Sequence, residues 1–160
     1  MIKRYRAVQY GCGPIGCRVV QYALERSNIE LVGAVDIAPD KAGKDLGEIA
    51  KVGRKLGITV SSDAGRTLSA LKPDIVFHTT GSKFDRVFDQ LRGIVEAGCN
   101  IVSTCEELSY PYRKHPDLAA QLDKLARANK VTVLATGINP GFLMDMWPIF
   151  MTGVCKEVRE

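Results

Sequence analysis

The feature that most constrains this fold is a glycine-rich turn near the start of the chain, GCGPIG at residues 11–16. A short apolar segment at 6–10 runs into this turn, and a helical pattern over 14–26 follows it at once. Asp36 comes 20 positions after the last glycine, at the end of a second apolar segment over 31–35. A GxGxxG turn between a strand and a helix, with an acid at that distance, is typical of a dinucleotide-binding βαβ unit. The sequence therefore predicts a parallel α/β fold with a cofactor at this turn.

Each glycine of the turn has a structural role. Gly11 permits the tight turn, Gly13 lets the backbone approach a pyrophosphate without a Cβ, and Gly16 lets the helix pack close to the sheet. The helix begins at Pro14 and Ile15, and the free N–H groups of its first turn face the phosphates. We therefore assign these five residues to cofactor binding. The alternative is a glycine turn of an α/β domain that binds no ligand.

The carboxylate of Asp36 bears on the choice of cofactor. It can accept hydrogen bonds from both ribose hydroxyls of an adenosine, and it repels a 2′-phosphate. The predicted cofactor is therefore NAD or NADP with NAD slightly preferred, because the nearby Lys41 and Lys44 soften the repulsion. The alternative for Asp36 is an acid that caps a helix or a turn.

Strand-like and helix-like segments alternate through the rest of the chain. Further strands are expected at 58–60, 75–79, 100–104 and 130–135, and further helices within 38–55 and at 66–71, 83–97, 116–129 and 143–151. This order predicts a Rossmann-type doubly wound parallel sheet of about six strands with helices on both faces. We expect residues 1–153 to form the dinucleotide-binding domain. Residues 154–160 alternate like a strand, and we expect them to start a crossover into a second domain that this chain lacks.

Composition excludes several classes of protein. The 160 residues are 46% hydrophobic and 25% charged, as in ordinary soluble domains. A net charge of +4 without a basic, aromatic-interleaved patch argues against a nucleic-acid partner, and no apolar run approaches the roughly 20 residues of a membrane helix. A strand and a glycine turn follow the basic N-terminus where a signal peptide would have its apolar core, so a cytoplasmic location is expected. Five scattered cysteines and two distant histidines predict neither a disulfide framework nor a metal site.

Ligands of an open parallel sheet bind at the carboxyl ends of its strands, so the residues that follow each strand are candidate site residues. Thr79, Thr80 and Gly81 follow the fourth strand and can touch the ribose or the nicotinamide; alternatively they cap the next helix. Ser103 ends the fifth strand and is assigned to the cofactor as well. Asn139 can pair with the carboxamide, or it can simply belong to an Asn-Pro-Gly turn.

Two adjacent carboxylates, Glu106 and Glu107, follow the fifth strand where a nicotinamide ring is expected. A partly desolvated carboxylate there can act as a general base, and the alternative is a pair of solvated acids in a loop or a first helical turn. Cys105 offers a thiolate nucleophile for an aldehyde, or it is a small buried apolar residue. Phe142 and Trp147 are expected to line an apolar substrate pocket; the alternative is an ordinary place in the core.

Together, GCGPIG, Asp36, STCEELSYP at 103–111 and GINPGF at 137–142 followed by Trp147 resemble the 2,4-diaminopentanoate dehydrogenase and native amine dehydrogenase family. This family belongs to the dihydrodipicolinate-reductase-like Rossmann oxidoreductases, and the resemblance spans essentially the whole chain. It implies reversible oxidative deamination of an amine to a ketone and ammonia with NAD(P). It also implies that Glu106 is the base, with Glu107 in reserve.

The resemblance has further implications. Phe142 and Trp147 would shape the amine pocket. Family members are longer than this chain, and their second α/β domain closes the pocket and makes a homodimer. The chain alone is therefore expected to bind cofactor and to lack part of its substrate site.

Three alternative functions remain open at this point. One is an imine reductase like dihydrodipicolinate reductase, although no cationic cluster for a dicarboxylate follows the fifth strand. Another is a CoA-acylating aldehyde dehydrogenase that uses Cys105. The third is a non-catalytic NAD-binding or sensor module, against which the two glutamates argue.

Overall fold

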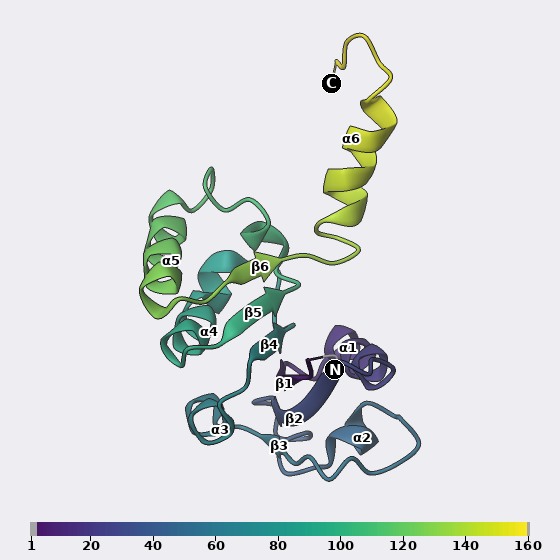
Figure 1. Cartoon of the computed structure of the whole chain (residues 1–160), viewed down its shortest axis with the longest axis vertical. Coiled ribbons are helices and arrows are strands. Elements are labelled where there is room, and N and C mark those ends of the chain that lie inside the picture. The colour runs from purple at the N-terminus through teal and green to yellow at the C-terminus, as the bar shows by residue number, and fades with distance from the viewer. Residues whose placement is uncertain (1–2, 160) are drawn as a thin grey trace.

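The fold is built on one sheet of six parallel strands, seen in a computed structural model that describes residues 3–159 (Figure 1). The strands pair in the order β3-β2-β1-β4-β5-β6. They are β1 (Tyr5–Tyr10), β2 (Ile29–Val35), β3 (Val60–Ser61), β4 (Ile75–His78), β5 (Asn100–Ser103) and β6 (Val133–Ala135). The strand order reverses between β1 and β4, which creates the switch point where ligands of such sheets bind. The predicted fold class is confirmed.

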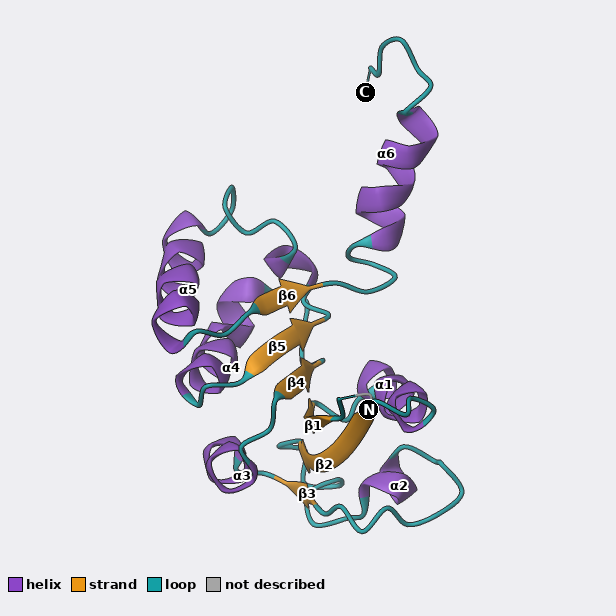
Figure 2. Ribbon diagram, viewed as in Figure 1, coloured by secondary structure: helices purple, strands orange, loops and turns teal. Residues whose placement is uncertain are grey.

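Helices cover both faces of this sheet (Figure 2). The helices of the chain are α1 (Pro14–Leu24), α2 (Leu46–Ile49), α3 (Ala64–Leu71), α4 (Phe84–Glu96), α5 (Pro116–Asn129) and α6 (Trp147–Thr152), with a 3-10 turn η1 (Glu106–Leu108) and a π-helical turn η2 (Phe142–Met146). The helices α1 and α2 lie on one face, and α3, α4 and α5 lie on the other. This is the doubly wound arrangement that right-handed βαβ crossovers produce.

Two apolar cores hold the layers together. The larger core fills the space between the sheet and α3, α4 and α5, and it includes the fully buried Phe84, Leu91 and Ile94 of α4. The smaller core lies under α1 and α2, around Val20 and Leu46. Each such side chain contributes about 1.5–3 kcal/mol through removal of apolar surface from water. The cores fix the positions of the strand ends that carry the site.

Two element boundaries on the β3 edge differ from those predicted. The third strand is not 58–60, because the Ile58 carbonyl accepts the Leu46 N–H and so faces the loop before α2 instead of the sheet. The helix α3 starts earlier than the predicted 66–71, because the Asp63 carboxylate accepts the Arg66 N–H at 2.9 Å and caps its first turn.

The sixth strand is shorter than the predicted 130–135. Lys130 has a left-handed backbone with φ of 56°, and its N–H bonds to carbonyl oxygens of the last turn of α5. The residue therefore ends the helix, and the chain joins the sheet only at Val133. A C-terminal cap that needs a positive φ is usually a glycine, so a lysine at this position is no local signal for the turn.

The last segment leaves the sheet. The predicted apolar helix over 143–151 is present as η2 and α6, which extend away from the rest of the fold (Figure 1). Ile149 and Phe150 are 72% and 75% exposed on it. The alternation over 154–160 suggested a strand, but its described part, 154–159, forms a turn and irregular backbone. No described strand lies beside it to pair its backbone groups. In residues 3–159, no helix has both the length and the apolar character needed to span a bilayer.

Candidate functional site

The glycine turn has the geometry that its sequence requires. Gly11 has φ of +93°, and a Cβ there would lie 2.8 Å from the Thr79 carbonyl oxygen and 2.9 Å from the Thr80 Cγ2. A Cβ on Gly16 would collide with the Gly11 carbonyl oxygen. These two glycines allow β1, α1 and the loop after β4 to approach one another closely. The space that a side chain on Gly11 or Gly16 would need is occupied by other atoms of the protein.

Gly13 differs from the other two glycines of the turn. A Cβ on it would meet no heavy atom within 4 Å, so the space beside it is open. It stands at the N-cap of α1, and within the described residues no side chain caps this helix. The N–H groups of Ile15 and Gly16 in the first turn therefore lack a side-chain acceptor. An open space over an uncapped helix start is the arrangement that binds a phosphate.

A cleft at the switch point gathers much of the predicted cofactor site. Its walls come from the ends of β1, β2 and β4, and from a residue of α4. The lining residues are Tyr10, Gly11, Gly13, Asp36, Ile37, Lys41, Thr79, Thr80 and Gln90. Five predicted cofactor residues are thus brought together at one edge of the sheet.

Asp36 is held at the rim of this cleft by three donors. Its Oδ1 accepts the Ala38 N–H at 2.9 Å, and its Oδ2 accepts the Cys12 N–H at 2.7 Å and the Lys41 ammonium at 3.0 Å. Burial raises the pKa of Asp36, but these hydrogen bonds and the ammonium outweigh it, so the pKa lies below its ordinary value. The ionised carboxylate therefore ties the glycine turn to the end of β2.

The hydroxyl of Thr79 holds the turn from the other side. It donates to the Gly11 carbonyl at 2.8 Å and accepts from the Gln9 amide Nε2 at 2.8 Å. Gln9 is fully buried, and its Nε2 also donates to the Gly11 carbonyl at 2.8 Å. Sequence reasoning missed Gln9, although a lone amide inside an apolar strand was a visible signal. Thr79 lines the cleft, yet its hydroxyl already has partners in the protein.

A buried histidine that sequence reasoning also missed lies at the end of β4. The Nε2 of His78 lies 2.9 Å from the Thr80 hydroxyl and 3.0 Å from the Gln90 amide oxygen, and its Nδ1 lies 2.9 Å from the Ser103 hydroxyl. Burial lowers the pKa of His78, which favours a neutral ring. The signal was a histidine inside the apolar strand IVFH.

One assignment of protons satisfies this whole network. Thr80 donates to the Gln90 oxygen at 2.6 Å, so the Thr80 oxygen must accept from Nε2–H of His78. Nδ1 then accepts from the Ser103 hydroxyl, whose oxygen accepts the Cys105 N–H at 3.1 Å. Ser103 is fully buried in this network and does not line the cleft. Its predicted contact with the cofactor therefore has no geometric support.

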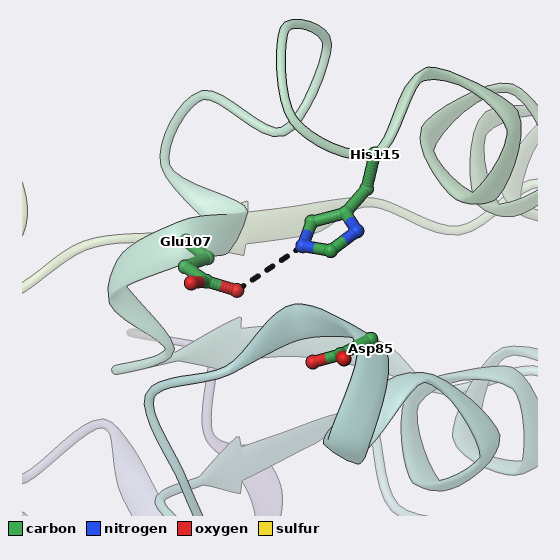
Figure 3. Close-up of side chains that lie close together, drawn as sticks. All are labelled: Asp85, Glu107 and His115. Atoms are coloured by element: carbon green, nitrogen blue, oxygen red, sulfur yellow. Dashed lines mark hydrogen bonds and ion pairs between the residues drawn. The ribbon is translucent and has the colours of Figure 1, made fainter.

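The two glutamates after β5 have different surroundings. Glu107 accepts the Phe84 N–H at 3.0 Å, the Lys83 ammonium at 2.9 Å and the Lys114 ammonium. It also accepts from the His115 Nε2 at 3.2 Å, the contact drawn in Figure 3. The two ammoniums, together with the other hydrogen bonds, hold the pKa of Glu107 far below its ordinary value. Glu107 thus joins η1 to the start of α4. A carboxylate so strongly held in its ionised form is a poor proton acceptor.

Glu106 is the free carboxylate of the pair. It is exposed at the start of η1, and its side chain makes no hydrogen bond or ion pair with residues 3–159. It follows β5, which neighbours β4 at the same edge of the sheet as the cleft. Of the two predicted bases, Glu106 is therefore the one whose geometry leaves a lone pair available for substrate.

A cluster of possible metal ligands lies next to these residues. The ligand atoms of Asp85, Glu107 and His115 lie within 4.8 Å of one another (Figure 3). Lys83 and Lys114 both donate to Glu107, so a cation would have to displace two ammonium groups. Glu107 thus pairs with Lys83 and Lys114 and contacts His115, and these contacts join η1 to the residues that begin α4 and α5.

Several other predicted site residues do not line the cleft. Cys105 is fully buried, and burial raises the pKa of its thiol, which disfavours a thiolate nucleophile. Gly81 and Asn139 are exposed, and Asn139 precedes a cis-Pro in a loop. Phe142 and Trp147 contact each other with ring centroids 5.7 Å apart, but both are partly exposed, at 38% and 48%. In the described part of the chain they form neither a closed pocket nor core.

A parallel sheet with a glycine turn, an uncapped helix start and an acid at its switch point defines a Rossmann-type dinucleotide-binding domain. Residues 6–105 match the family "Dihydrodipicolinate reductase, N-terminus", so the chain belongs to this family. It is therefore an NAD(P)-binding domain of an oxidoreductase family. The open space at Gly13 and the free N–H groups of α1 fit the pyrophosphate of such a cofactor.

Similar proteins point to one branch of this family. The chain is 33% identical to 2,4-diaminopentanoate dehydrogenase of Acetoanaerobium sticklandii, over 99% of this chain and 45% of that protein. It is 36% identical to the amine dehydrogenase of Mycobacterium smegmatis, whose structure it matches with a TM-score of 0.88 over 96% of this chain and 45% of that one. The chain thus spans less than half the length of these relatives. The resemblance seen in the sequence motifs is confirmed.

A more distant structure supports the fold alone. The WlbA dehydrogenase from Bordetella pertussis, solved in complex with NADH and UDP-GlcNAcA, is 18% identical and matches with a TM-score of 0.63. The match covers 84% of this chain and 35% of that one.

Proposed function

We propose that this chain is the cofactor-binding part of an NAD(P)-dependent amine dehydrogenase. Its reaction is the reversible oxidative deamination of an amine similar to 2,4-diaminopentanoate, which gives a ketone and ammonia. The similarity to a 2,4-diaminopentanoate dehydrogenase and to an amine dehydrogenase supports this class of substrate. The free carboxylate of Glu106 at the end of β5 is the observation that carries the proposed chemistry.

Different residues of the chain bind the cofactor and transfer the proton in this reaction. The glycine turn and the start of α1 hold the pyrophosphate, and Asp36 fixes the adenosine end. Held there, NAD(P) would supply the hydride acceptor for the carbon that carries the amine. Ionised Glu106 takes a proton from the water that adds to the resulting carbon–nitrogen double bond, and its charge balances the cationic nitrogen. Loss of ammonia then leaves the ketone.

Glu107 supports this chemistry without taking part in proton transfer. Its bonds to the Phe84 N–H and to Lys83 tie η1 to the start of α4. Because Glu106 begins the same turn, its place at the edge of the sheet depends on these bonds. Glu107 is therefore a positioning residue, and Glu106 is the general base.

The test is amine-dependent reduction of NAD or NADP by the full-length protein, with 2,4-diaminopentanoate and simple alkylamines as substrates. Glu106→Gln should lower the turnover rate by about 100- to 10,000-fold, as loss of a general base does. It should leave the affinity for cofactor unchanged. Full activity of Glu106→Gln would rule out this base. Reduction of a cyclic imine dicarboxylate, with no amine oxidation, would favour the imine reductase that the family match also allows.

The partners follow from the same proposal. We expect the full-length protein to form a homodimer, and to use a small-molecule amine or ketone and ammonia. Sedimentation equilibrium of the full-length protein measures the oligomeric state directly. A monomer at micromolar concentration would contradict this part of the proposal.

A further inference from the structure

A second concave site lies at the edge of the sheet opposite to the cofactor cleft. This pocket has a volume of about 510 Å³, and its walls come from the amino ends of β1 and β2, the end of α1 and the loop before β3. Its charged lining consists of four cations, Arg4, Arg26, Arg54 and Lys55, and two carboxylates, Glu25 and Glu30. The lining therefore carries a net positive charge.

The cations of this pocket are not neutralised by the protein itself. None of the ion pairs formed within residues 3–159 involves any of the six charged side chains, although two of the six are carboxylates. Like charges that gather on a concave surface repel one another, and the surface concentrates their field. An anion that binds between them relieves this repulsion, and all four cations are exposed and available to it.

The backbone segments that carry these cations are held in place by hydrogen bonds. The loop before β3 is fixed by Asp45, whose carboxylate accepts the Leu56 N–H at 3.0 Å and the Gly57 N–H at 2.8 Å. The Tyr5 N–H donates to the Asn28 carbonyl at 2.8 Å, which joins the start of β1 to the turn after α1. The walls of the pocket are therefore part of the fold.

The types of side chain in the lining favour phosphate among the anions. Three of the four cations are arginines, whose planar guanidinium presents its N–H groups in a fork that matches two oxygens of a phosphate. Leu31, Leu56 and Ile58 also line the pocket, and each is half-buried. They pack against the smaller core, so they give the pocket a firm apolar part beside its exposed cations.

We propose that this pocket binds a small ligand that carries two or more adjacent phosphate groups. The four cations reach the pocket from three separate segments, so they can contact neighbouring phosphates at the same time. The site is distinct from the cofactor cleft, because α1 begins at the glycine turn and its last residue, Leu24, lines this pocket. A helix of 11 residues separates the two sites by about 16 Å. The proposal does not depend on the reaction proposed above.

Titration calorimetry of the chain with inorganic tripolyphosphate tests this proposal. We expect the wild type to bind it at low salt, and the affinity to fall as salt is added, because salt screens the charges. The double variant Arg26→Gln/Arg54→Gln should bind tripolyphosphate at least about tenfold more weakly, as loss of charge-assisted hydrogen bonds does. Its affinity for NAD should equal that of the wild type. Citrate, an anion without phosphate, should bind the wild type more weakly than tripolyphosphate does.

Two further proteins serve as controls. Arg86→Gln/Arg113→Gln removes the same charge from two exposed arginines that do not line the pocket, and should bind tripolyphosphate like the wild type. Gly13→Val fills the open space at the glycine turn, where a phosphate probe could also bind, and should keep its affinity for tripolyphosphate. Circular dichroism establishes that each variant is folded.

Four results would overturn the proposal. They are absence of tripolyphosphate binding by the folded wild type at low salt, unchanged binding by Arg26→Gln/Arg54→Gln, an equal loss in the control pair of arginines, and binding of citrate as tight as that of tripolyphosphate. Loss of tripolyphosphate binding in Gly13→Val alone would place the probe at the glycine turn, and would overturn the second site while it supports the cofactor cleft.

Discussion

The Nδ1 atom of His78 lies 2.9 Å from the hydroxyl oxygen of Ser103, and this contact joins the ends of β4 and β5 inside the protein. On one side, the His78 ring reaches Thr80 in the wall of the cleft. On the other, Ser103 accepts the N–H of Cys105, the residue before Glu106. A chain of hydrogen bonds therefore runs from Thr80 in the cleft wall to the backbone of Cys105, one residue before the proposed base.

The buried His78 predicts a pH dependence of stability. Its pKa is lowered in the folded protein, so below about pH 6.5, the ordinary value for histidine, the unfolded chain binds a proton that the folded chain excludes. The free energy of unfolding should therefore fall as the pH drops from 7 toward 5. Urea unfolding across this range measures the slope. His78→Gln should be less stable at neutral pH and should lose most of this slope, whereas an unchanged slope would contradict the assignment to His78.

Glu107 predicts a structural effect that Glu106 does not share. Glu107→Gln should lower the melting temperature, because it removes the charge that holds two lysines and weakens the bond to the start of α4. Glu106→Gln is the matched control and should melt like the wild type. The pKa of Glu107 is lowered on folding, so its contribution is present above about pH 4.5 and is lost as the pH falls further. Equal melting temperatures for the two variants would show that the ion-pair network does not stabilise the fold.

The glycines of the turn should separate folding from binding. Gly11→Ala should destabilise the fold by about 1–2 kcal/mol, because a Cβ is strained at its positive φ and approaches the Thr79 carbonyl. Gly13→Ala has open space and an ordinary backbone, so its free energy of unfolding should stay within about 0.5 kcal/mol of the wild type. Urea denaturation of both variants measures the difference. A larger loss for Gly13→Ala than for Gly11→Ala would mean that the turn is packed differently.

Substitution of Cys105 distinguishes an amine dehydrogenase from an aldehyde dehydrogenase that uses this thiol. Its thiol is buried, its pKa is raised, and it donates to the Ser82 carbonyl at 3.4 Å. Cys105→Ala should therefore keep amine-dependent turnover within about tenfold of the wild type in the full-length protein, because the thiol does not react. An aldehyde dehydrogenase that forms a covalent thioester would lose all activity. Complete loss in a folded variant would restore that alternative.

The parts of the site that sequence predicted are those fixed by local chemistry. The glycine turn and Asp36 depend on spacing within one βαβ unit, so their place at the switch point follows from the sequence. The alternation of strands and helices likewise predicted the parallel sheet, because apolar periodicity indicates the type of each element and the face that it buries. Lys130 shows the limit of such reasoning, since a lysine rather than a glycine ends α5.

The parts that sequence did not resolve depend on contacts between distant segments. Glu106 and Glu107 are neighbours with the same chemistry, and they differ in the partners that other segments bring to Glu107, among them Lys83 and Lys114. Ser103 looked available at a strand end, but His78, 25 positions earlier, takes its hydroxyl. No periodicity or motif encodes these partners, because they come together only when β4, β5 and α5 pack.

The most direct test of the account is calorimetric titration of NADH into this chain and into Gly13→Val. A valine side chain would fill the open space beside the start of α1 and block the pyrophosphate, while the fold should persist. We predict micromolar to sub-millimolar binding by the wild type and no measurable binding by the folded variant. Equally tight binding to both proteins would contradict the placement of the cofactor at the glycine turn.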